Sequence, residues 1–522
     1  MTDSEKPETG VGTPLLPALS KPVLVAAITI KILLHIPGLF RYGYFRDELY
    51  FLDCARHLDW GYVDCAPLVA VYAKIALLLG GSLPALRILP ILAGAGTVAL
   101  TILIARQLGG GVFAQALAGL AIIIAPVHLM LDSILSMNAF EPLFWMGCVL
   151  ILIRIIRGAN PRLWLVFGAL AGLGLENKHS TLFFGVAVAV AVVATPLRRE
   201  LARPWIWLGG AVALVIFAPN LIWQWQNGFP TLEDLQNVRE VGKNVELAPI
   251  PFLLQQTLIM HPANLPVWLA GLWFLLVGRG RAFRAVGLIY VSLLVILMVL
   301  HAKDYYLAPV YPMLLAAGGV AIEMWGTNIS GARARSAALA AVAGLLVLLG
   351  AVFAPIALPL LSPANYVAYQ QKLGLAPQKT EVAHVGPLPQ LWGDQFGWPE
   401  LVEEVAEIYW ALPEEERLRT GIFASNYGEA GAINLFGPQH GLPPAICAHQ
   451  THSMWGPGDF AGNQLIWMQW EPDWLEDRCG SVEIVGAHHH PWGMAEENRP
   501  ILLCRDPSPS LAEQWPGLTH WN

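Results

Sequence analysis

The chain has 522 residues, of which 55% are hydrophobic and only 13% are charged, and its mean hydropathy is +0.52. A soluble protein of this length would form about three domains, but this hydrophobicity and the 20 tryptophans predict a chain that lies mostly in lipid. The net charge of −7, without any arginine-rich or zinc-finger motif, excludes a nucleic-acid-binding protein.

The first 20 residues are polar and contain no basic run, no short apolar core and no small-residue cleavage site. They therefore do not predict a cleaved signal peptide. We expect residues 1–21 to form a cytoplasmic tail and the first apolar stretch to direct insertion into the membrane.

Residues 22–361 contain about eleven stretches that are apolar and long enough to cross a bilayer. A helix needs roughly 20 apolar residues to span about 30 Å of hydrocarbon. The stretches are 22–40, 85–106, 112–130, 138–156, 162–176, 179–197, 204–223, 262–278, 284–301, 307–325 and 334–361. They predict an all-α polytopic membrane domain.

Arginine is concentrated in every second loop of this domain. Short loops with positive charge stay on the cytoplasmic side. With the N-terminus inside, the inner loops carry Arg106, Arg154, Arg157, Arg162, Arg198, Arg199, Arg203, Arg279, Arg281, Arg284, Arg333 and Arg335. An odd number of spans then places the C-terminal region outside. We expect a multi-pass protein of the cell (inner) membrane.

The first outer loop, residues 41–84, is unusually rich in charge. It contains Asp47, Glu48, Asp53, Asp59 and Asp64, together with Arg41, Arg46 and Arg56. Neighbours on a helix point about 100° apart, so we expect one of Asp47 and Glu48 to face a site and the other to pack or pair. A carboxylate at Asp47 suits a base that accepts a hydroxyl proton. The alternative is an interfacial salt bridge with Arg46.

Further polar residues lie at the outer ends of later spans. Glu141 lies about one turn inside a span that opens with Asn138, and acids at such depth are costly and usually functional. A buried hydrogen-bond partner for a neighbouring helix is the alternative. We expect Asp132, in the preceding loop, to be solvated, and Trp223 and Trp225 to belong to an interfacial aromatic belt.

Basic side chains lie on the same predicted face. They are Arg87, Lys178, His179, His301 and Lys303. Lysine binds phosphate as a point charge, so cations that converge with acids favour a phosphate-bearing substrate approached from the membrane. Each alone is more often a snorkelling residue, and Arg87 could equally bind headgroups.

Residues 362–522 predict a soluble extracytoplasmic α/β domain, with a helix over 398–416 and strands over 420–424, 446–448, 464–469 and 481–486. Its segment Ser425–Gly431 fits a tight turn better than an anion cradle at a helix N-terminus. His488–His490 fit a solvated loop better than a metal site. Disulfides are permitted on this side, but the sequence does not specify how Cys54, Cys65, Cys447, Cys479 and Cys504 would pair.

Four segments resemble bacterial family 39 glycosyltransferases, relatives of protein O-mannosyltransferases and lipid A aminoarabinose transferases. They are RDELYFLDCARHLDWGYVD with PL shortly after it, LSMNAFEPLFW, GLENKHS and KDYYLAPVYP. The likeness covers roughly residues 22–325 and, more loosely, the outer domain. The first of the four segments is the most specific.

The resemblance implies a GT-C-like fold with its active site at the outer leaflet, taking a sugar from a polyprenyl-phosphate carrier. Asp47 matches the family's catalytic acid, and Glu141 stands near a second one. Lys178 and Lys303 match basic positions near the lipid phosphate. The other residues expected to bind substrate are Glu48, Asp64, Arg87, Asn138, His179, Tyr305 and Tyr306.

One position departs from the family. Relatives usually carry a polar or basic residue where this chain has Cys65, before Ala66 and Pro67. A thiol cannot supply that contact, so another group supplies it, donor handling differs, or the member is inactive.

We therefore expect an inverting hexosyl- or pentosyltransferase that moves a sugar from a polyprenyl phosphate to a hydroxyl of a lipid, glycan or protein. No nucleotide-sugar or metal motif is present, so we expect no cofactor and no metal. A flippase or transporter of a lipid-linked sugar is the alternative, with charges at mid-membrane, although no internal repeat supports it. In a third reading, a non-catalytic receptor, Asp47 and Glu141 would be replaceable.

Overall fold

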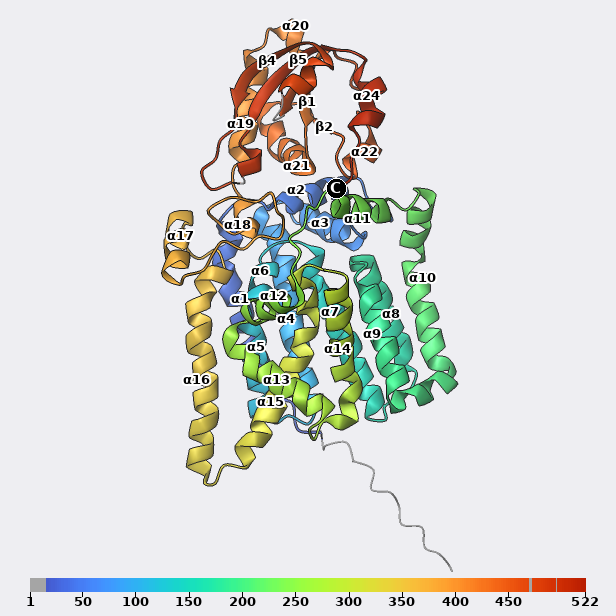
Figure 1. Cartoon of the computed structure of the whole chain (residues 1–522), viewed down its shortest axis with the longest axis vertical. Coiled ribbons are helices and arrows are strands. Elements are labelled where there is room, and N and C mark those ends of the chain that lie inside the picture. The colour runs from blue at the N-terminus through green and yellow to red at the C-terminus, as the bar shows by residue number, and fades with distance from the viewer. Residues whose placement is uncertain (1–15, 469–471, 494) are drawn as a thin grey trace, which may run out of the picture.

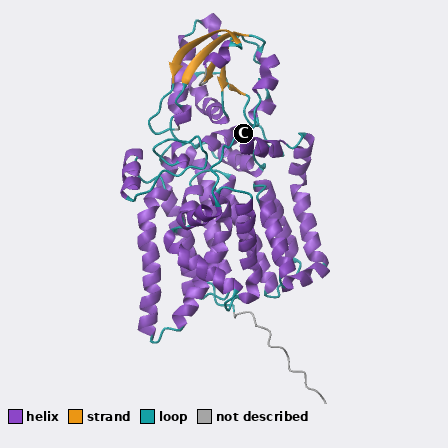
Figure 2. Ribbon diagram, viewed as in Figure 1, coloured by secondary structure: helices purple, strands orange, loops and turns teal. Residues whose placement is uncertain are grey.

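The computed structural model describes residues 16–468, 472–493 and 495–522. A long helical bundle occupies one part of the molecule, and a small region containing all the described strands covers one end of it (Figure 1, Figure 2). Residues 1–15 of the expected tail and Gln469 of an expected strand lie outside the described residues.

The bundle begins at Lys21, and its apolar runs form helices that end mostly at glycine, proline or polar residues. Its helices are α1 (Lys21–His35), α2 (Arg46–Arg56), α3 (Leu68–Leu78), α4 (Leu83–Gln107), α5 (Val112–Ile123), α6 (Pro126–Leu131), α7 (Met137–Ile156), α8 (Leu163–Asn177), α9 (Thr181–Ala194), α10 (Pro204–Gln226), α11 (Pro230–Glu240), α12 (Pro249–Ile259), α13 (Leu265–Leu276), α14 (Arg284–Val299), the 3-10 helix η5 (Asp304–Val310), α15 (Tyr311–Thr327) and α16 (Ala332–Ala357).

Seven described helical segments are long and apolar enough to cross a membrane, and nine if each of two bent helix pairs counts as one span. The protein is thus a multi-pass membrane protein. The count is below the eleven expected because four of the expected stretches do not form one long helix. Pro126 separates α5 from α6, and bends of 101° and 98° occur near Pro196 and Pro262. The fourth stretch, 162–176, forms α8, which has only 15 residues.

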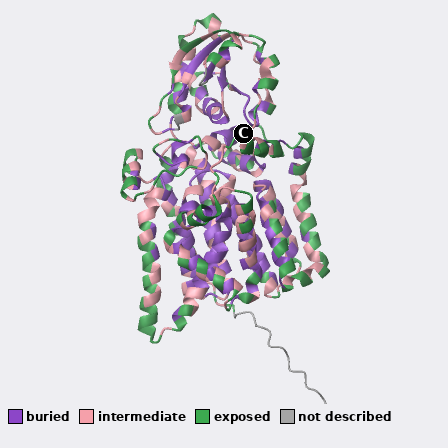
Figure 3. Ribbon diagram, viewed as in Figure 1, coloured by how far each residue is buried: buried purple, intermediate pink, exposed green. Residues whose placement is uncertain are grey.

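The centre of the bundle is buried, whereas α10 and α16 at its edges are largely exposed (Figure 3). Glycines allow backbones to approach closely, as is usual between membrane helices. Gly168 of α8 lies directly against Gly209 of α10, and a Cβ at Gly271 of α13 would meet the Leu314 carbonyl of α15. These contacts leave no room for a larger side chain.

Some polar residues lie elsewhere than expected. Asp132 is 2% exposed, because it forms an ion pair of 2.7 Å with Lys31 of α1 instead of contacting solvent. Trp223 is also buried: its indole N–H donates to Asp59 at 2.8 Å, so only Trp225 remains exposed as an interfacial residue would be. His488 is buried and 2.7 Å from Glu404, so it does not belong to a solvated loop.

The C-terminal region contains a five-stranded sheet in the order β2-β1-β3-β5-β4, in which β1, β2 and β3 are parallel and β5 is antiparallel to β3 and β4. The strands are β1 (Thr420–Ala424), β2 (Ala445–Cys447), β3 (Gln464–Met468), β4 (Cys479–Ala487) and β5 (Pro500–Pro507). The helices are α17 (Pro363–Lys372), α18 (Gln390–Gly393), α19 (Trp398–Ala411), α20 (Glu414–Arg417), α21 (Tyr427–Phe436), α22 (His452–Trp455), α23 (Pro472–Glu476) and α24 (Leu511–Leu518).

A disulfide joins Cys479 of β4 to Cys504 of β5. The other three cysteines that could have paired, Cys54, Cys65 and Cys447, are free and buried. The parallel strands point their carboxyl ends toward the bundle, where α21 lies against α2 (Figure 1). This packing brings the C-terminal region onto the first loop of the membrane domain.

Candidate active site

The first loop is anchored to the bundle by a buried ion pair. Glu48 is fully buried and caps the N-terminus of α2 by accepting from the Phe45 N–H at 2.9 Å. Its carboxylate also accepts from the Leu135 N–H and lies 3.3 Å from Arg87. Arg87 in turn donates to the carbonyls of Gly38, Arg41 and Gly43. Glu48 and Arg87 are therefore occupied in holding the loop.

Asp47 points the other way, as expected for the neighbour of Glu48 on a helix. Its Oδ1 accepts a hydrogen bond of 2.9 Å from the Tyr427 hydroxyl and lies 3.8 Å from Nε of Arg46. Its side chain is 34% exposed. Within the described residues, its Oδ2 has no hydrogen-bond partner. One oxygen of Asp47 is thus held while the other remains available.

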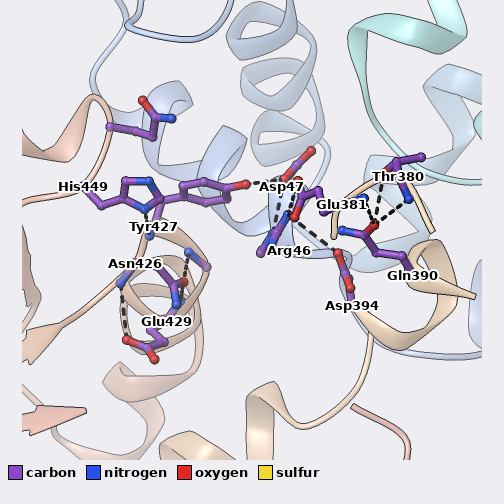
Figure 4. A network of polar contacts seen from close by, with 12 residues as sticks. Arg46, Asp47, Thr380, Glu381, Gln390, Asp394, Asn426, Tyr427, Glu429 and His449 are labelled. Atoms are coloured by element: carbon purple, nitrogen blue, oxygen red, sulfur yellow. Dashed lines mark hydrogen bonds and ion pairs between the residues drawn. The ribbon is translucent and has the colours of Figure 1, made fainter. Parts of the chain in front are cut away.

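Arg46 is turned mainly toward the C-terminal region. Its Nη2 lies 3.2 Å from both carboxylate oxygens of Glu381 and 3.8 Å from Asp394 (Figure 4). Burial opposes ionisation of Glu381, but the charges of Arg46, Lys243 and Lys303 outweigh it and lower the pKa of Glu381 to about 2. The salt-bridge alternative for Asp47 is therefore only a long contact, because Glu381 is the main partner of Arg46.

We call Arg46, Asp47, Glu381, Asp394 and Tyr427 the Asp47 cluster. Asp394 is fully buried, and this burial raises its pKa well above the ordinary range despite Arg46. Lys303 lies close enough for its charge to act on Glu381. In the described part of the chain, the Lys303 ammonium has no ion-pair partner within 4.0 Å. A cation without a fixed partner thus borders the cluster.

A second polar cluster lies between α7 and the start of α9. The Lys178 ammonium donates to Asn138 at 2.8 Å and to Oε2 of Glu141 at 3.3 Å. The Ser180 hydroxyl donates to the other oxygen of Glu141. Glu141 is 2% exposed. We call Asn138, Glu141, Lys178, Ser180 and Tyr306 the Lys178 cluster.

The two clusters meet at η5. The Lys178 ammonium lies 4.0 Å from the centre of the Tyr306 ring and 5.7 Å from that of Tyr305. Tyr305 also lies within range of the charges of Asp47 and Glu381. The structure therefore brings Asp47, Lys178, Lys303, Tyr305 and Tyr306 to one end of the bundle, as the sequence predicts.

Asp64 adjoins the Asp47 cluster from the segment between α2 and α3. It accepts a hydrogen bond of 2.7 Å from Tyr50. Burial, together with the charges of Asp234 and Asp47, raises the pKa of Asp64 to about 7. Cys65 beside it is 2% exposed and packs in an apolar cluster with Tyr50 and Cys54. His179 belongs to neither cluster, and its Nε2 shares a hydrogen bond of 2.9 Å with Asn220.

Tyr427, Glu381, Asp394 and Lys243 are not among the candidates that the sequence suggests, since each lies more than 150 residues from Asp47 and none belongs to a recognisable motif. Tyr427 does lie in the segment Ser425–Gly431, for which the sequence favours a tight turn over an anion cradle. There, the Asn426 side chain accepts from the N–H groups of Gly428 and Glu429 at 2.9 and 3.0 Å. These N–H groups at the N-terminus of α21 are already bonded to Asn426, so they do not form a cradle for an anion.

Residues 64–223 match the family model described as dolichyl-phosphate-mannose-protein mannosyltransferase. The match includes Asp64, Glu141 and Lys178 and begins after Asp47. None of the curated proteins compared with the chain matches it.

The fold is similar to that of ArnT from Cupriavidus metallidurans. The structure bound to undecaprenyl phosphate is 16% identical, with a TM-score of 0.58, and the match covers 94% of this chain and 99% of that one. The apo structure is 15% identical, with a TM-score of 0.57, covering 93% and 98%. The mycobacterial arabinofuranosyltransferase AftD matches with a TM-score of 0.46 and 16% identity, over 69% of this chain and 29% of that one.

Together, the family match and the two ArnT structures confirm the resemblance to family 39 glycosyltransferases and the GT-C fold. The predicted fold class, a polytopic helical domain followed by an α/β region, is confirmed as well.

Proposed function

We propose that the chain is an inverting glycosyltransferase that moves a sugar from a polyprenyl-phosphate carrier to a hydroxyl of a lipid, glycan or protein acceptor. The observation that carries this proposal is Asp47, which keeps one unpartnered oxygen at the end of the bundle where Lys178 and Lys303 also lie. An anionic base beside cations is what transfer from a lipid phosphate to a hydroxyl requires.

In this reaction the acceptor oxygen attacks the anomeric carbon from the face opposite the phosphate. The bond between that carbon and the phosphate oxygen breaks, and its electron pair leaves with the polyprenyl phosphate. The acceptor proton passes to Asp47, whose free Oδ2 can receive it while Oδ1 stays bound to Tyr427. Base assistance of this kind contributes about 10² to 10⁴ in rate.

Lys178 and Lys303 would stabilise the negative charge that develops on the departing phosphate. Glu141, expected as a second catalytic acid, is better suited to hold Lys178, because both of its oxygens are already used. Asn138 fixes Lys178 from the other side. In this proposal Glu48 and Arg87 position the loop, and Asp64, Tyr305 and Tyr306 border the reacting groups.

The proposed reaction takes place on the extracytoplasmic face. The α9–α10, α13–α14 and α15–α16 connections, which contain arginine-rich inner loops of the sequence, lie at the end of the bundle away from the C-terminal region (Figure 1). Positive short loops favour the cytoplasmic side. This supports placing the Asp47 cluster and residues 362–522 outside the (inner) membrane, with the N-terminus in the cytoplasm.

The test is transfer by the full-length protein in nanodiscs, supplied with a labelled polyprenyl-phosphate sugar and acceptor lipids. Asp47→Asn should lower transfer at least 100-fold. The control is Asp59→Asn on the same loop, whose side chain is exposed and contacts Trp223; it should retain activity. Unchanged transfer by Asp47→Asn would discard the assignment. Movement of the labelled lipid across liposome membranes without sugar transfer would favour the flippase alternative.

A further inference from the structure

The most distant residue in the Asp47 cluster comes from the C-terminal region. Tyr427 is 380 positions from Asp47 along the chain, yet its hydroxyl donates to the Asp47 carboxylate at 2.9 Å (Figure 4). We propose that Tyr427 is a positioning residue for transfer: it fixes the Asp47 carboxylate through one oxygen so that the other faces the acceptor. This inference rests on the proposed function of Asp47 as the base.

The position of Tyr427 is fixed by close packing of α21 on α2. A Cβ at Gly428 would lie 2.6 Å from Cγ of Arg46, and one at Gly431 would lie 2.7 Å from the carbonyl carbon of Leu49. The glycines of α21 therefore lie directly against the backbone of Leu49 and the first carbons of the Arg46 side chain. Because Tyr427 opens α21, this contact sets the distance between its hydroxyl and α2.

The Tyr427 ring is also held in place. It is 8% exposed, its centre lies 5.0 Å from that of a stacked His449 ring, and the Tyr50 ring lies 4.9 Å away. The Arg46 guanidinium lies over its face at 5.6 Å. A ring enclosed in this way has little rotational freedom, so its hydroxyl can orient a partner at little entropic cost.

The hydroxyl remains a donor across the neutral range. Burial is the main reason why the pKa of Tyr427 is raised well above its ordinary value, although Arg46 opposes this shift. A donor beside a carboxylate favours the ionised form. Tyr427 therefore both orients Asp47 and supports the form of it that can accept a proton.

The other charged groups near Asp47 are mostly acidic. Arg46 on α2 is the neighbouring cation. Asp64, between α2 and α3, and Glu381 and Asp394, in the segment before α19, carry carboxyl groups within electrostatic range, and Tyr305 approaches from η5. Glu381 is the acid of this group whose pKa is lowered, and an ionised acid nearby disfavours a further negative charge. Arg46, with Lys243 and Lys303 near Glu381, supplies positive charge that offsets this repulsion, and the Tyr427 hydroxyl adds a hydrogen-bond donor at Asp47 itself.

The experiment compares Tyr427→Phe with Asn434→Ala in the full-length protein. Both remove a hydrogen bond between α21 and α2, because Asn434 donates to Asp53 at 2.7 Å. Phenylalanine keeps the ring, whereas Asn434→Ala also removes the acceptor of the Ala445 N–H, so the control perturbs docking at least as much. Thermal unfolding of both variants checks that they fold.

For Tyr427→Phe we expect kcat to fall roughly 10- to 100-fold, since hydrogen bonds to charged groups are the strong ones. The KM for the lipid-linked sugar should change less than about twofold, because Tyr427 acts through Asp47. The acid limb of the kcat–pH profile should move upward by about one pH unit. Asn434→Ala should leave that limb in place.

Two results would overturn the inference: an acid limb that stays in place in Tyr427→Phe, or an equal shift in Asn434→Ala. The Asp47→Asn variant separates this failure from failure of the proposed function. If Asp47→Asn is inactive and Tyr427→Phe has the wild-type profile, Asp47 keeps its role and Tyr427 loses the one proposed here.

Discussion

Asp47 and Asp53 lie on one short helix, α2, and both receive hydrogen bonds from the C-terminal region. Asp53 is 2% exposed, and its two oxygens are taken up by Arg56 on one side and by Asn434 and His452 on the other. Asp47 is 34% exposed and is bound through Oδ1 alone. Asp53 therefore holds α2 against the C-terminal region, whereas Asp47 retains an oxygen for chemistry.

The largest expected effect comes from neutralising these two acids separately. Asp47→Asn should lower transfer about 10²- to 10⁴-fold and leave the unfolding temperature nearly unchanged. Asp53→Asn should cost about 1–3 kcal/mol of stability, because it weakens charge-assisted bonds in a buried site, and should lower transfer less than about tenfold. Transfer assays and thermal unfolding of both variants check this; comparable rate losses in the two would erase the distinction.

Glu141 resembles Asp53, because both of its oxygens are occupied, one by Lys178 and the other by Ser180. Lys178→Met should lower transfer roughly 100-fold and also destabilise the protein, because it leaves Glu141 buried without its cation. The double variant Lys178→Met with Glu141→Gln should recover stability but not transfer. Recovery of transfer in the double variant would contradict a role for the ammonium in binding phosphate.

A smaller effect is expected from Glu381, which binds the Arg46 guanidinium at 3.2 Å and leaves Asp47 a longer contact of 3.8 Å with it. Its pKa is lowered to about 2, mainly by Arg46 acting against burial. A lowered pKa stabilises the folded state above the ordinary value of about 4.3, and this contribution is lost as pH falls toward 2. Glu381→Gln should therefore flatten the decline in unfolding temperature below pH 4.5 and reduce transfer about tenfold.

Measurement of unfolding temperature from pH 2 to pH 7 checks the Glu381 prediction. Glu404→Gln is a control for removing an acid of the C-terminal region outside the Asp47 cluster, since Glu404 contacts His488. Parallel acid curves for Glu381→Gln and the wild type would show that the Arg46 pair contributes little.

The smallest effect concerns Asp64, whose pKa is raised to about 7. A folded carboxyl that holds its proton more tightly than the unfolded one stabilises the protein at low pH and loses this contribution as pH rises from about 4 to 7. Asp64→Asn should thus raise the unfolding temperature by at least about 2 °C at pH 8 and change it little at pH 4. An equal shift at both pH values would rule out this titration.

Hydrophobic length and charge placement were sufficient to predict the polytopic bundle, the C-terminal α/β region and the approach of acids and lysines at one end. The divergence of Asp47 and Glu48 also followed from helical geometry. Span boundaries were less predictable, because prolines such as Pro126 and Pro262 bend or break stretches that composition alone reads as continuous.

Long-range partners could not be predicted. Nothing near Glu381 or Tyr427 in the sequence indicates that they reach α2, since those contacts depend on how the C-terminal region packs. The burial of Asp132 was missed for the same reason: a polar loop residue looks solvated until its partner Lys31 is placed beside it. A single sequence shows which residues carry charge but not which pairs neutralise one another.

The ion pair between Lys31 and Asp132 has a consequence for biogenesis. Lys31 lies in the first membrane helix, and a lysine at the centre of such a helix costs about 2.5–3.5 kcal/mol during insertion. Its partner is synthesised about a hundred residues later. The first helix therefore enters the membrane with an uncompensated cation and is secured only when the segment that carries Asp132 is made, which couples its final seating to translation of the residues between them.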